Sequence, residues 1–433
     1  MLTADPLYGA FEIPGWLERV IATPEVQRLR EVRLLNTSTP VFPALSDTRR
    51  FTHTLGVLHL ALEIAPALRW RYPQKHVQAF FVSCIVHDLG TPAFGHVFEY
   101  ILKSKTGWSH EANFRQIIRG TYRPEGPYAQ IYYRRGLRLY SVLEDLELGE
   151  YEDLIASYVV GQKDLGWLIS GSMDLDNIDN VYRMAWLLGL GPNITQALDL
   201  ARSIDTDDRG LSFSPAALPL VQAWQALRRS AYEILAFDES NLAGQAMLTE
   251  LLMGAMDKNV LGEEHWYLTD EQLLQYLSRN DMPPELRDVV HRFATADYYA
   301  SVFLGWYGQA KGERDLRLPS ELELLREALS DRLGIPCCPY VFYDNGTFEK
   351  ELNLHLCHSA DYTDGVTNVT LGQTSRSTLV GVFTPSRIKS PSKRMIDRAQ
   401  DVLNQFGLPT SSLKPIPDKR AVYELPGQTK LPL

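Results

Sequence analysis

Apolar residues recur at helical spacing along most of the chain. In residues 52–68, Leu55, Leu58 and Leu62 return every three or four positions, which places them on one face of a predicted helix. The same spacing predicts further helices at 74–88, 174–190 and 220–256. We therefore expect residues 1–333 to form one helical domain.

The pattern changes at Gly334-Ile335-Pro336. Two runs rich in β-branched and aromatic residues, 340–343 and 378–384, predict strands, and residues 392–406 predict a helix. These elements indicate a smaller α+β lobe over residues 334–412. Residues 413–433 contain several prolines and lysines and are expected to be a flexible tail. The predicted fold class is mainly α, with a smaller α+β C-terminal lobe.

Composition excludes some functions and leaves others open. The chain has 433 residues, is 45% hydrophobic and carries a formal net charge of -10, so a broad basic surface for nucleic acid is not expected. A local basic pocket for a phosphorylated small molecule is compatible with that charge. We expect no apolar run long enough to span a membrane, and no signal peptide at the N-terminus. Four cysteines do not make a disulfide framework, which favours a cytoplasmic location.

The strongest chemical signal is the pair His87-Asp88 at the end of the helix predicted at 74–88. Both groups are costly to bury unless something pairs with them, and a divalent cation would satisfy both. With His53 before them and Asp176 after them, two imidazoles and two carboxylates could close on one metal ion. Mixed nitrogen and oxygen ligands suit Mn, Fe, Co, Ni or Zn, and Mg stays open.

Each of these residues also has a structural alternative. His53 could be a hydrogen-bonded core histidine, and His87-Asp88 could form only the end of a helix. Asp179, one turn after Asp176, is interpreted as the partner of Arg183 in an ion pair on a solvated helix face.

A second group of polar residues follows the His-Asp pair. His96 and Glu99 are three residues apart on a predicted helix and share a face, and His110 begins another helix. They could supply proton transfer and the group that orients it. Arg50 could contact a phosphate, because phosphoryl transfer requires that the negative charge of the phosphate be neutralised. The alternatives are a structural His96–Glu99 pair and an ion pair between Arg50 and Asp47.

The chemical residues lie within an ordered series of motifs. The series comprises Asp5–Gly9 (DPLYG), Thr23–Arg30 (TPEVQRLR), Val41–Pro43 (VFP), Arg50–Val57 (RFTHTLGV) and His87–Glu99 (HDLGTPAFGHVFE). It resembles the HD-domain deoxynucleoside triphosphate triphosphohydrolases, which include bacterial dGTPases and the vertebrate SAM-and-HD-domain enzyme. The resemblance extends to about Met253. It implies an HD-domain helical bundle that hydrolyses a dNTP to the deoxynucleoside and tripolyphosphate.

The resemblance also implies roles for individual residues. It assigns one divalent metal ion per chain to His53, His87, Asp88 and Asp176. It assigns catalytic roles to His96, Glu99 and His110, and contacts with the phosphates and the sugar to Arg50 and Tyr232. Tyr232 could equally be a core residue. As partners it implies a nucleotide substrate, a nucleotide effector and further copies of the chain in a homo-oligomer.

Some positions depart from the family pattern. Leu34 and Leu35 stand where the best-known members have a Gln-Leu pair, and Met184 replaces an aspartate that reads the sugar 3′-hydroxyl. These changes motivate an alternative, an HD phosphohydrolase that acts on a nucleoside monophosphate or an unusual nucleotide. A non-catalytic nucleotide sensor is a second alternative. Its expected signature is loss of metal ligands, and all four are retained in the sequence.

Overall fold

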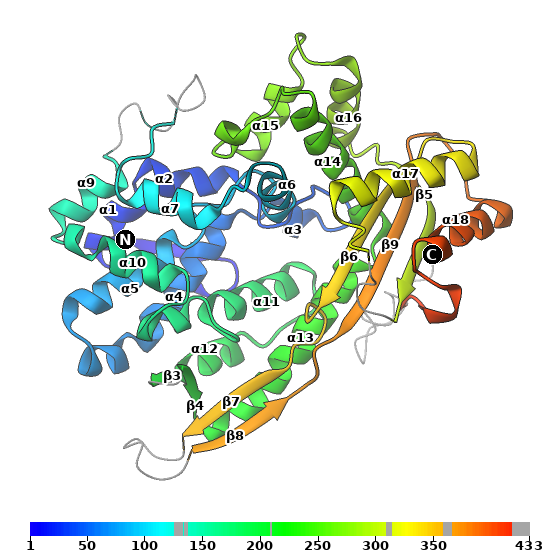
Figure 1. The fold of residues 1–433 in the computed structure, drawn as a ribbon. Helices are drawn as coiled ribbons and strands as arrows, with labels where there is room; N and C mark the ends of the chain where they lie inside the picture. Colours follow the sequence, from blue (N-terminus) through cyan, green and yellow to red (C-terminus); the bar gives the residue numbers. More distant parts are fainter. Residues whose placement is uncertain (125–132, 134–136, 208–209, 309–313, 358–365, 418–433) are drawn as a thin grey trace.

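The computed structural model describes residues 1–124, 133, 137–207, 210–308, 314–357 and 366–417. Helices dominate the first half, and a long sheet flanked by α17 and α18 lies at the C-terminal side (Figure 1). The mainly α fold with an α+β C-terminal part is confirmed.

The helices of the first half are α1 (Gly15–Ile21), α2 (Pro24–Gln27), α3 (Pro43–Asp47), α4 (Arg50–Arg71), α5 (Gln74–Val86), α6 (His96–Thr106), α7 (His110–Ile118), α9 (Leu139–Asp145), α10 (Glu152–Val159), α11 (Leu175–Leu187) and α12 (Ile194–Arg202). The later helices are α13 (Leu218–Ala236), α14 (Glu239–Asp257), α15 (Asp270–Leu277), α16 (Pro284–Ala294), α17 (Pro319–Leu333) and α18 (Lys393–Gln405).

The helix predicted at 220–256 is two helices, α13 and α14. The break lies at Phe237 and Asp238. Asp238 is the N-cap of α14, and its side chain accepts a hydrogen bond of 2.8 Å from the backbone N–H of Asn241. An aspartate in this position satisfies a free N–H of the first turn and so favours a new helix start. Apolar periodicity continues through the break, which is why spacing alone did not reveal it.

Three sheets lie among the described residues. Strands β1 (Leu2–Asp5) and β2 (Gly9–Glu12) form a hairpin. The second sheet has the order β10-β5-β9-β6 and is antiparallel throughout. The third has the order β3-β4-β7-β8, with β4 and β7 parallel. Their strands are β3 (Ile204–Asp207), β4 (Gly210–Phe213), β5 (Ala300–Tyr307), β6 (Cys338–Asn345), β7 (Leu352–Cys357), β8 (Val366–Leu371), β9 (Arg376–Thr384) and β10 (Leu413–Lys414).

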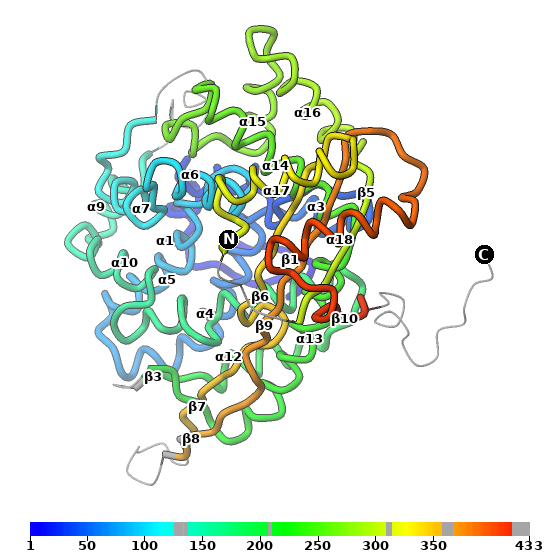
Figure 2. Tube along the Cα trace, turned by 45° about the vertical axis from the view of Figure 1, so that its right-hand side comes forward, coloured from blue at the N-terminus to red at the C-terminus, as the bar shows by residue number. Residues whose placement is uncertain are grey.

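The strands predicted at 340–343 and 378–384 lie within β6 and β9, which pair with each other. Residues 1–333 are not wholly helical, because β3, β4 and β5 precede residue 334 and join sheets with later strands. Figure 2 shows β7 and β8 continuing the ribbon of β6 and β9 toward α12. The division at residue 334 stays a prediction. Of the predicted tail, Leu413 and Lys414 form β10, whereas residues 418–433 lie outside the described residues.

Helix α4 corrects the expectation that no apolar segment is long enough to span a membrane. Its 22 residues satisfy that test by length and composition, but 67% of the apolar window is buried inside the protein. A helix that is apolar on all sides is also typical of a buried core helix. Helix α4 contacts α5, α11 and α12 and is surrounded by the main hydrophobic core.

Gly56 allows α4 and α11 to lie close together. A Cβ atom at this position would overlap Asp179 Oδ1 and Arg183 Nη2, which form a buried ion pair on α11. Because both side chains are held by other contacts, they have little room to move aside. The absence of a side chain at Gly56 therefore sets the distance between the two helices.

We predict that Gly56→Ala destabilises the protein despite the better helix propensity of alanine. Overpacking a filled interior costs about 1–3 kcal/mol, which exceeds the gain of about 1 kcal/mol from replacing a helical glycine. The control is Gly254→Ala in α14, where the new Cβ would meet only Leu286 Cδ2 at an ordinary 3.4 Å. The free energies of unfolding from urea titration should fall for Gly56→Ala and hold or rise for Gly254→Ala. A stabilised Gly56→Ala variant would contradict the close packing described here.

Candidate metal centre and active site

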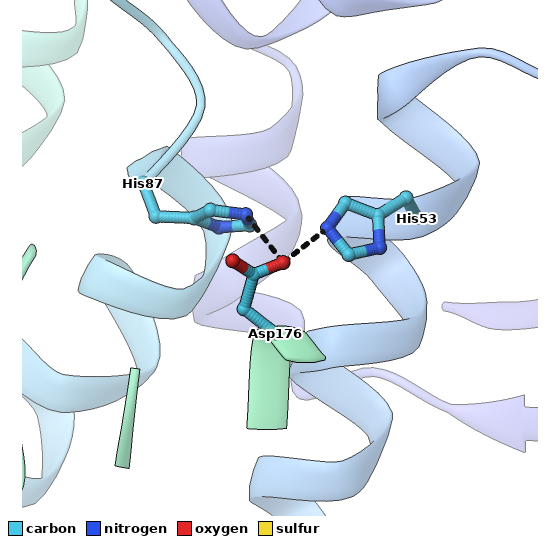
Figure 3. Close-up of side chains that lie close together, drawn as sticks. All are labelled: His53, His87 and Asp176. Atoms are coloured by element: carbon cyan, nitrogen blue, oxygen red, sulfur yellow. Dashed lines mark hydrogen bonds and ion pairs between the residues drawn. The ribbon is translucent and has the colours of Figure 1, made fainter. Parts of the chain in front are cut away.

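Three of the four predicted metal ligands converge on one point. His53 lies on α4, His87 follows the last residue of α5, and Asp176 lies in the first turn of α11. Asp176 Oδ1 is 2.8 Å from His53 Nε2 and 3.9 Å from His87 Nε2 (Figure 3). One ligand atom from each residue lies within 4.8 Å of the other two. Side chains from three separate helices thus present nitrogen and oxygen donors to a common centre.

His87 has the hydrogen-bond pattern of a metal-binding histidine. Its Nδ1 is 2.9 Å from the carbonyl oxygen of Cys84, so Nδ1 carries the proton and donates it. Nε2 then carries a free lone pair. This atom is buried and no described residue offers it a hydrogen bond. In a metal-bound histidine, one ring nitrogen typically faces the ion, and the other donates a hydrogen bond that fixes the ring. The donor set therefore fits a divalent cation.

His53 lies between two carboxylates. Its Nε2 faces Asp176 and its Nδ1 is 2.6 Å from Asp179 Oδ2. Burial lowers the pKa of His53, but the two carboxylates outweigh this effect and raise it to about 10. The proton on Nε2 occupies the place where a cation would bind, and the ion would have to displace it.

Asp179 is part of the candidate centre, which the sequence interpretation of a solvated residue missed. Its ion pair with Arg183 is present, with Arg183 Nη2 2.8 Å from Asp179 Oδ1, but the pair is buried rather than solvated. Burial raises the pKa of Asp179, and Arg183 and His53 together lower it to about 2. Asp179 therefore holds the His53 ring. The sequence feature that could have placed Asp179 at the centre is its position one turn after Asp176, which puts both carboxylates on one face of α11.

Asp88, the fourth predicted ligand, lies beside the cluster and is held by other groups. Arg50 Nη1 donates to both of its oxygens, at 2.8 and 3.0 Å, and the Thr91 hydroxyl donates at 3.0 Å. Its Oδ2 is 3.7 Å from His87 Nε2. Burial opposes ionisation of Asp88, but Arg50 holds its pKa well below the usual range. Arg50 thus pairs with Asp88 rather than Asp47, and metal ligation by Asp88 stays a prediction.

Glu99 joins the two candidate catalytic histidines. Its Oε2 is 3.0 Å from His96 Nδ1 and its Oε1 is 2.6 Å from His110 Nδ1. Burial raises the pKa of Glu99, but the two imidazoles outweigh this and lower it. The hydrogen bond that His110 donates to Glu99 raises the pKa of His110. A Cβ at Gly90 would lie 2.7 Å from the backbone oxygen of His110, so the start of α7 packs on the turn that follows Asp88.

A cavity of about 570 Å³ adjoins this second group of residues. His96, Glu99 and Tyr232 line it, together with residues of α14 and β6. Arg228 lies 4.7 Å from the ring centre of Tyr232. Met184 is buried in an apolar cluster against which Leu34, Leu35 and Tyr232 pack. Of these residues, Leu35 and Tyr232 line the cavity, so the apolar cluster reaches the site through Leu35.

Comparison with known proteins shows what the region around these residues resembles. The HD domain family matches residues 50–159, which contain His53, His87, Asp88, His96, Glu99 and His110. The deoxynucleoside triphosphate triphosphohydrolase SAMHD1 of Gallus gallus is 37% identical over 116 residues, which are 25% of this chain and 19% of that protein. The Homo sapiens protein is 35% identical over 116 residues, or 18% of its length. The chain therefore matches less than a fifth of the length of either relative.

A solved structure extends the likeness to the whole fold. A phosphohydrolase from Bacteroides thetaiotaomicron superposes with a TM-score of 0.64, covering 89% of this chain and 99% of that one at 17% identity. The predicted relationship to HD-domain phosphohydrolases is confirmed for the HD region, and the protein contains an HD domain. HD domains bind divalent metals, and the His53–His87–Asp176 cluster could hold such an ion.

We predict that Asp88→Ala and Asp176→Ala each abolish stoichiometric binding of a divalent ion, because each deletes a negatively charged ligand. Elemental analysis of the purified variants measures the metal content per chain. Asp199→Ala is the control, since Asp199 is an exposed carboxylate of α12 that pairs with Arg202. Full occupancy in Asp88→Ala, with loss only in Asp176→Ala, would restrict the site to His53, His87 and Asp176.

Proposed function

We propose that this protein is a metal-dependent phosphohydrolase that converts deoxynucleoside triphosphates to deoxynucleosides and tripolyphosphate. The observation that carries the proposal is the buried Nε2 of His87, which faces His53 and Asp176 and has no hydrogen-bond partner among the described residues. The similarity of the HD region to proteins named deoxynucleoside triphosphate triphosphohydrolase supports the choice of substrate class.

The proposed metal ligands are His53, His87, Asp176 and Asp88. A bound divalent ion would polarise a phosphoryl oxygen and lower the pKa of a bound water. Arg50 keeps Asp88 ionised and in position, and it is the proposed contact for the substrate phosphates. Manganese, iron, cobalt, nickel, zinc and magnesium all suit this donor set.

The proton-transfer group is His96, supported by Glu99 and His110. Because His96 Nδ1 faces Glu99, its Nε2 is the nitrogen available to a substrate, and the side chain is 81% exposed. In the proposed reaction, water attacks the α-phosphorus and the bond between that phosphorus and the 5′-oxygen breaks. His96 donates a proton to the 5′-oxygen as it leaves. The oxygen of the attacking water stays on the tripolyphosphate, and the proton that this water loses passes to the solvent.

One observation favours a second candidate function. Leu35, which lines the cavity and packs against the cluster of Met184, offers no hydrogen bond to a sugar hydroxyl. This suits a nucleoside monophosphate or an unusual nucleotide as substrate. The non-catalytic sensor is less well supported, because His53, His87 and Asp176 form an intact cluster. A nucleotide effector, a homo-oligomer and a cytoplasmic location remain predictions.

The direct test is product analysis. Purified protein is incubated with each dNTP and with dAMP or dGMP in the presence of Mn²⁺, and products are separated by ion-exchange chromatography. We expect deoxynucleoside and tripolyphosphate in equal amounts from the triphosphates, and none with Asp176→Ala. Release of pyrophosphate, or turnover of monophosphates alone, would replace the proposed reaction by another phosphohydrolase reaction.

We predict that His96→Ala retains the metal but lowers kcat by about 10²–10⁴-fold, the range for loss of a general acid or base. The control is His291→Ala, which removes a histidine from the exposed last turn of α16 and should leave kcat unchanged. Turnover of His96→Ala within a few-fold of the wild type would make the His96–Glu99 contact a structural pair.

A further inference from the structure

The cavity beside His96 is also lined by residues that the reaction does not use. Gln245 of α14 and Tyr340 of β6 line it, and much of the remaining surface is apolar. The apolar lining comes from Leu35, Val97, Leu242, Val341 and Phe342. A pocket of this kind buries most of the surface of a small ligand, and a few fixed polar groups then decide which ligand is accepted.

Tyr340 fixes the orientation of the Gln245 amide. The Tyr340 hydroxyl donates a 2.7 Å hydrogen bond to Gln245 Oε1. Burial raises the pKa of Tyr340, so its hydroxyl remains a proton donor. With the oxygen held in this way, the planar amide presents its NH₂ group in a defined direction. No described residue accepts a hydrogen bond from Gln245 Nε2, so its N–H groups are available to a ligand in the cavity.

Two neighbouring polar side chains of α14 that line the cavity, Asn241 and Thr249, are already engaged within the protein. The Asn241 side chain accepts from the Thr37 hydroxyl and donates to the Leu235 carbonyl oxygen. The Thr249 hydroxyl donates to the backbone oxygen of Gln245. Gln245 therefore differs from these neighbours in offering unpaired N–H donors on a side chain whose direction is fixed.

We propose that Gln245 reads the nucleobase and favours bases that carry a keto oxygen at the edge facing it. The proposal rests on the proposed function, since His96, Glu99 and Tyr232 line the same cavity. Guanine O6 and thymine O4 are hydrogen-bond acceptors, whereas adenine N6 and cytosine N4 are donors. At the position of this exocyclic group, an amide NH₂ pairs with guanine O6 or thymine O4. On adenine and cytosine it meets an amino group there and can pair only with a ring nitrogen beside it.

The test compares kcat/KM for dGTP, dTTP, dATP and dCTP. We expect the wild type to prefer dGTP and dTTP by roughly 3- to 10-fold, the effect of one neutral hydrogen bond. Gln245→Glu keeps an oxygen for Tyr340 but replaces the NH₂ donor by an acceptor, so the preference should invert toward dATP and dCTP. Tyr340→Phe frees the amide to rotate, so the ratio of kcat/KM between the keto and the amino bases should approach one.

Gln275→Glu makes the same chemical change at an exposed position of α15 and should leave the order of substrates unchanged. Equal rates for the four dNTPs in the wild type and in Gln245→Glu would overturn the role of Gln245 and leave dNTP hydrolysis standing.

A failure of the proposed function would be recognised separately, by the absence of hydrolysis with any dNTP. Titration calorimetry with free deoxyguanosine and deoxyadenosine then decides the proposal. Tighter binding of deoxyguanosine that reverses in Gln245→Glu supports base reading at this cavity. Equal affinities, or an unchanged order in Gln245→Glu, would overturn it.

Discussion

The site depends on a continuous chain of buried charges that links three elements. Asp5 Oδ2 lies 3.0 Å from Arg183, Arg183 pairs with Asp179, and Asp179 holds His53, whose other nitrogen faces Asp176. Isolated charges in a protein interior are strongly unfavourable, and removing one partner of a buried pair costs about 3–5 kcal/mol. Strand β1, helix α4 and helix α11 are therefore held in the one arrangement that keeps every charge paired. Gly56 gives the network the space it needs.

In both parts of the site, the metal cluster and the group around Glu99, each histidine ring is oriented by a hydrogen bond. His53 is oriented by Asp179 and His87 by the carbonyl of Cys84, so the nitrogen atoms that face the centre are set before any ion binds. Glu99 does the same for His96 and His110. Fixing side chains in advance lowers the reorganisation required during reaction. Packing between helices fixes two of these contacts, since Asp179–His53 joins α11 to α4 and Glu99–His110 joins α6 to α7. The contacts of His87 with Cys84 and of His96 with Glu99 are local in the chain.

The C-terminal part of the chain contributes to the site as well as to the fold. Strand β6 and helix α14 bring Tyr340 and Gln245 to the cavity that His96 and Glu99 line. Strand β5, which precedes this region in sequence, pairs with β9 at the centre of the same sheet. Helices α6, α13 and α14 and strand β6 thus line one cavity, which brings the C-terminal sheet next to His96 and Glu99.

The sequence by itself determined what depends on near neighbours. Apolar spacing predicted α4, α5 and α11, since residues three or four apart share a helix face, and the ordered motifs identified the HD region. Tertiary structure decided the rest. The parallel pairing of β4 with β7, the burial of Asp179 and the pairing of Arg50 with Asp88 join segments distant in the chain. Such contacts depend on the free energy of packing and of pairing buried charges, which local patterns do not record.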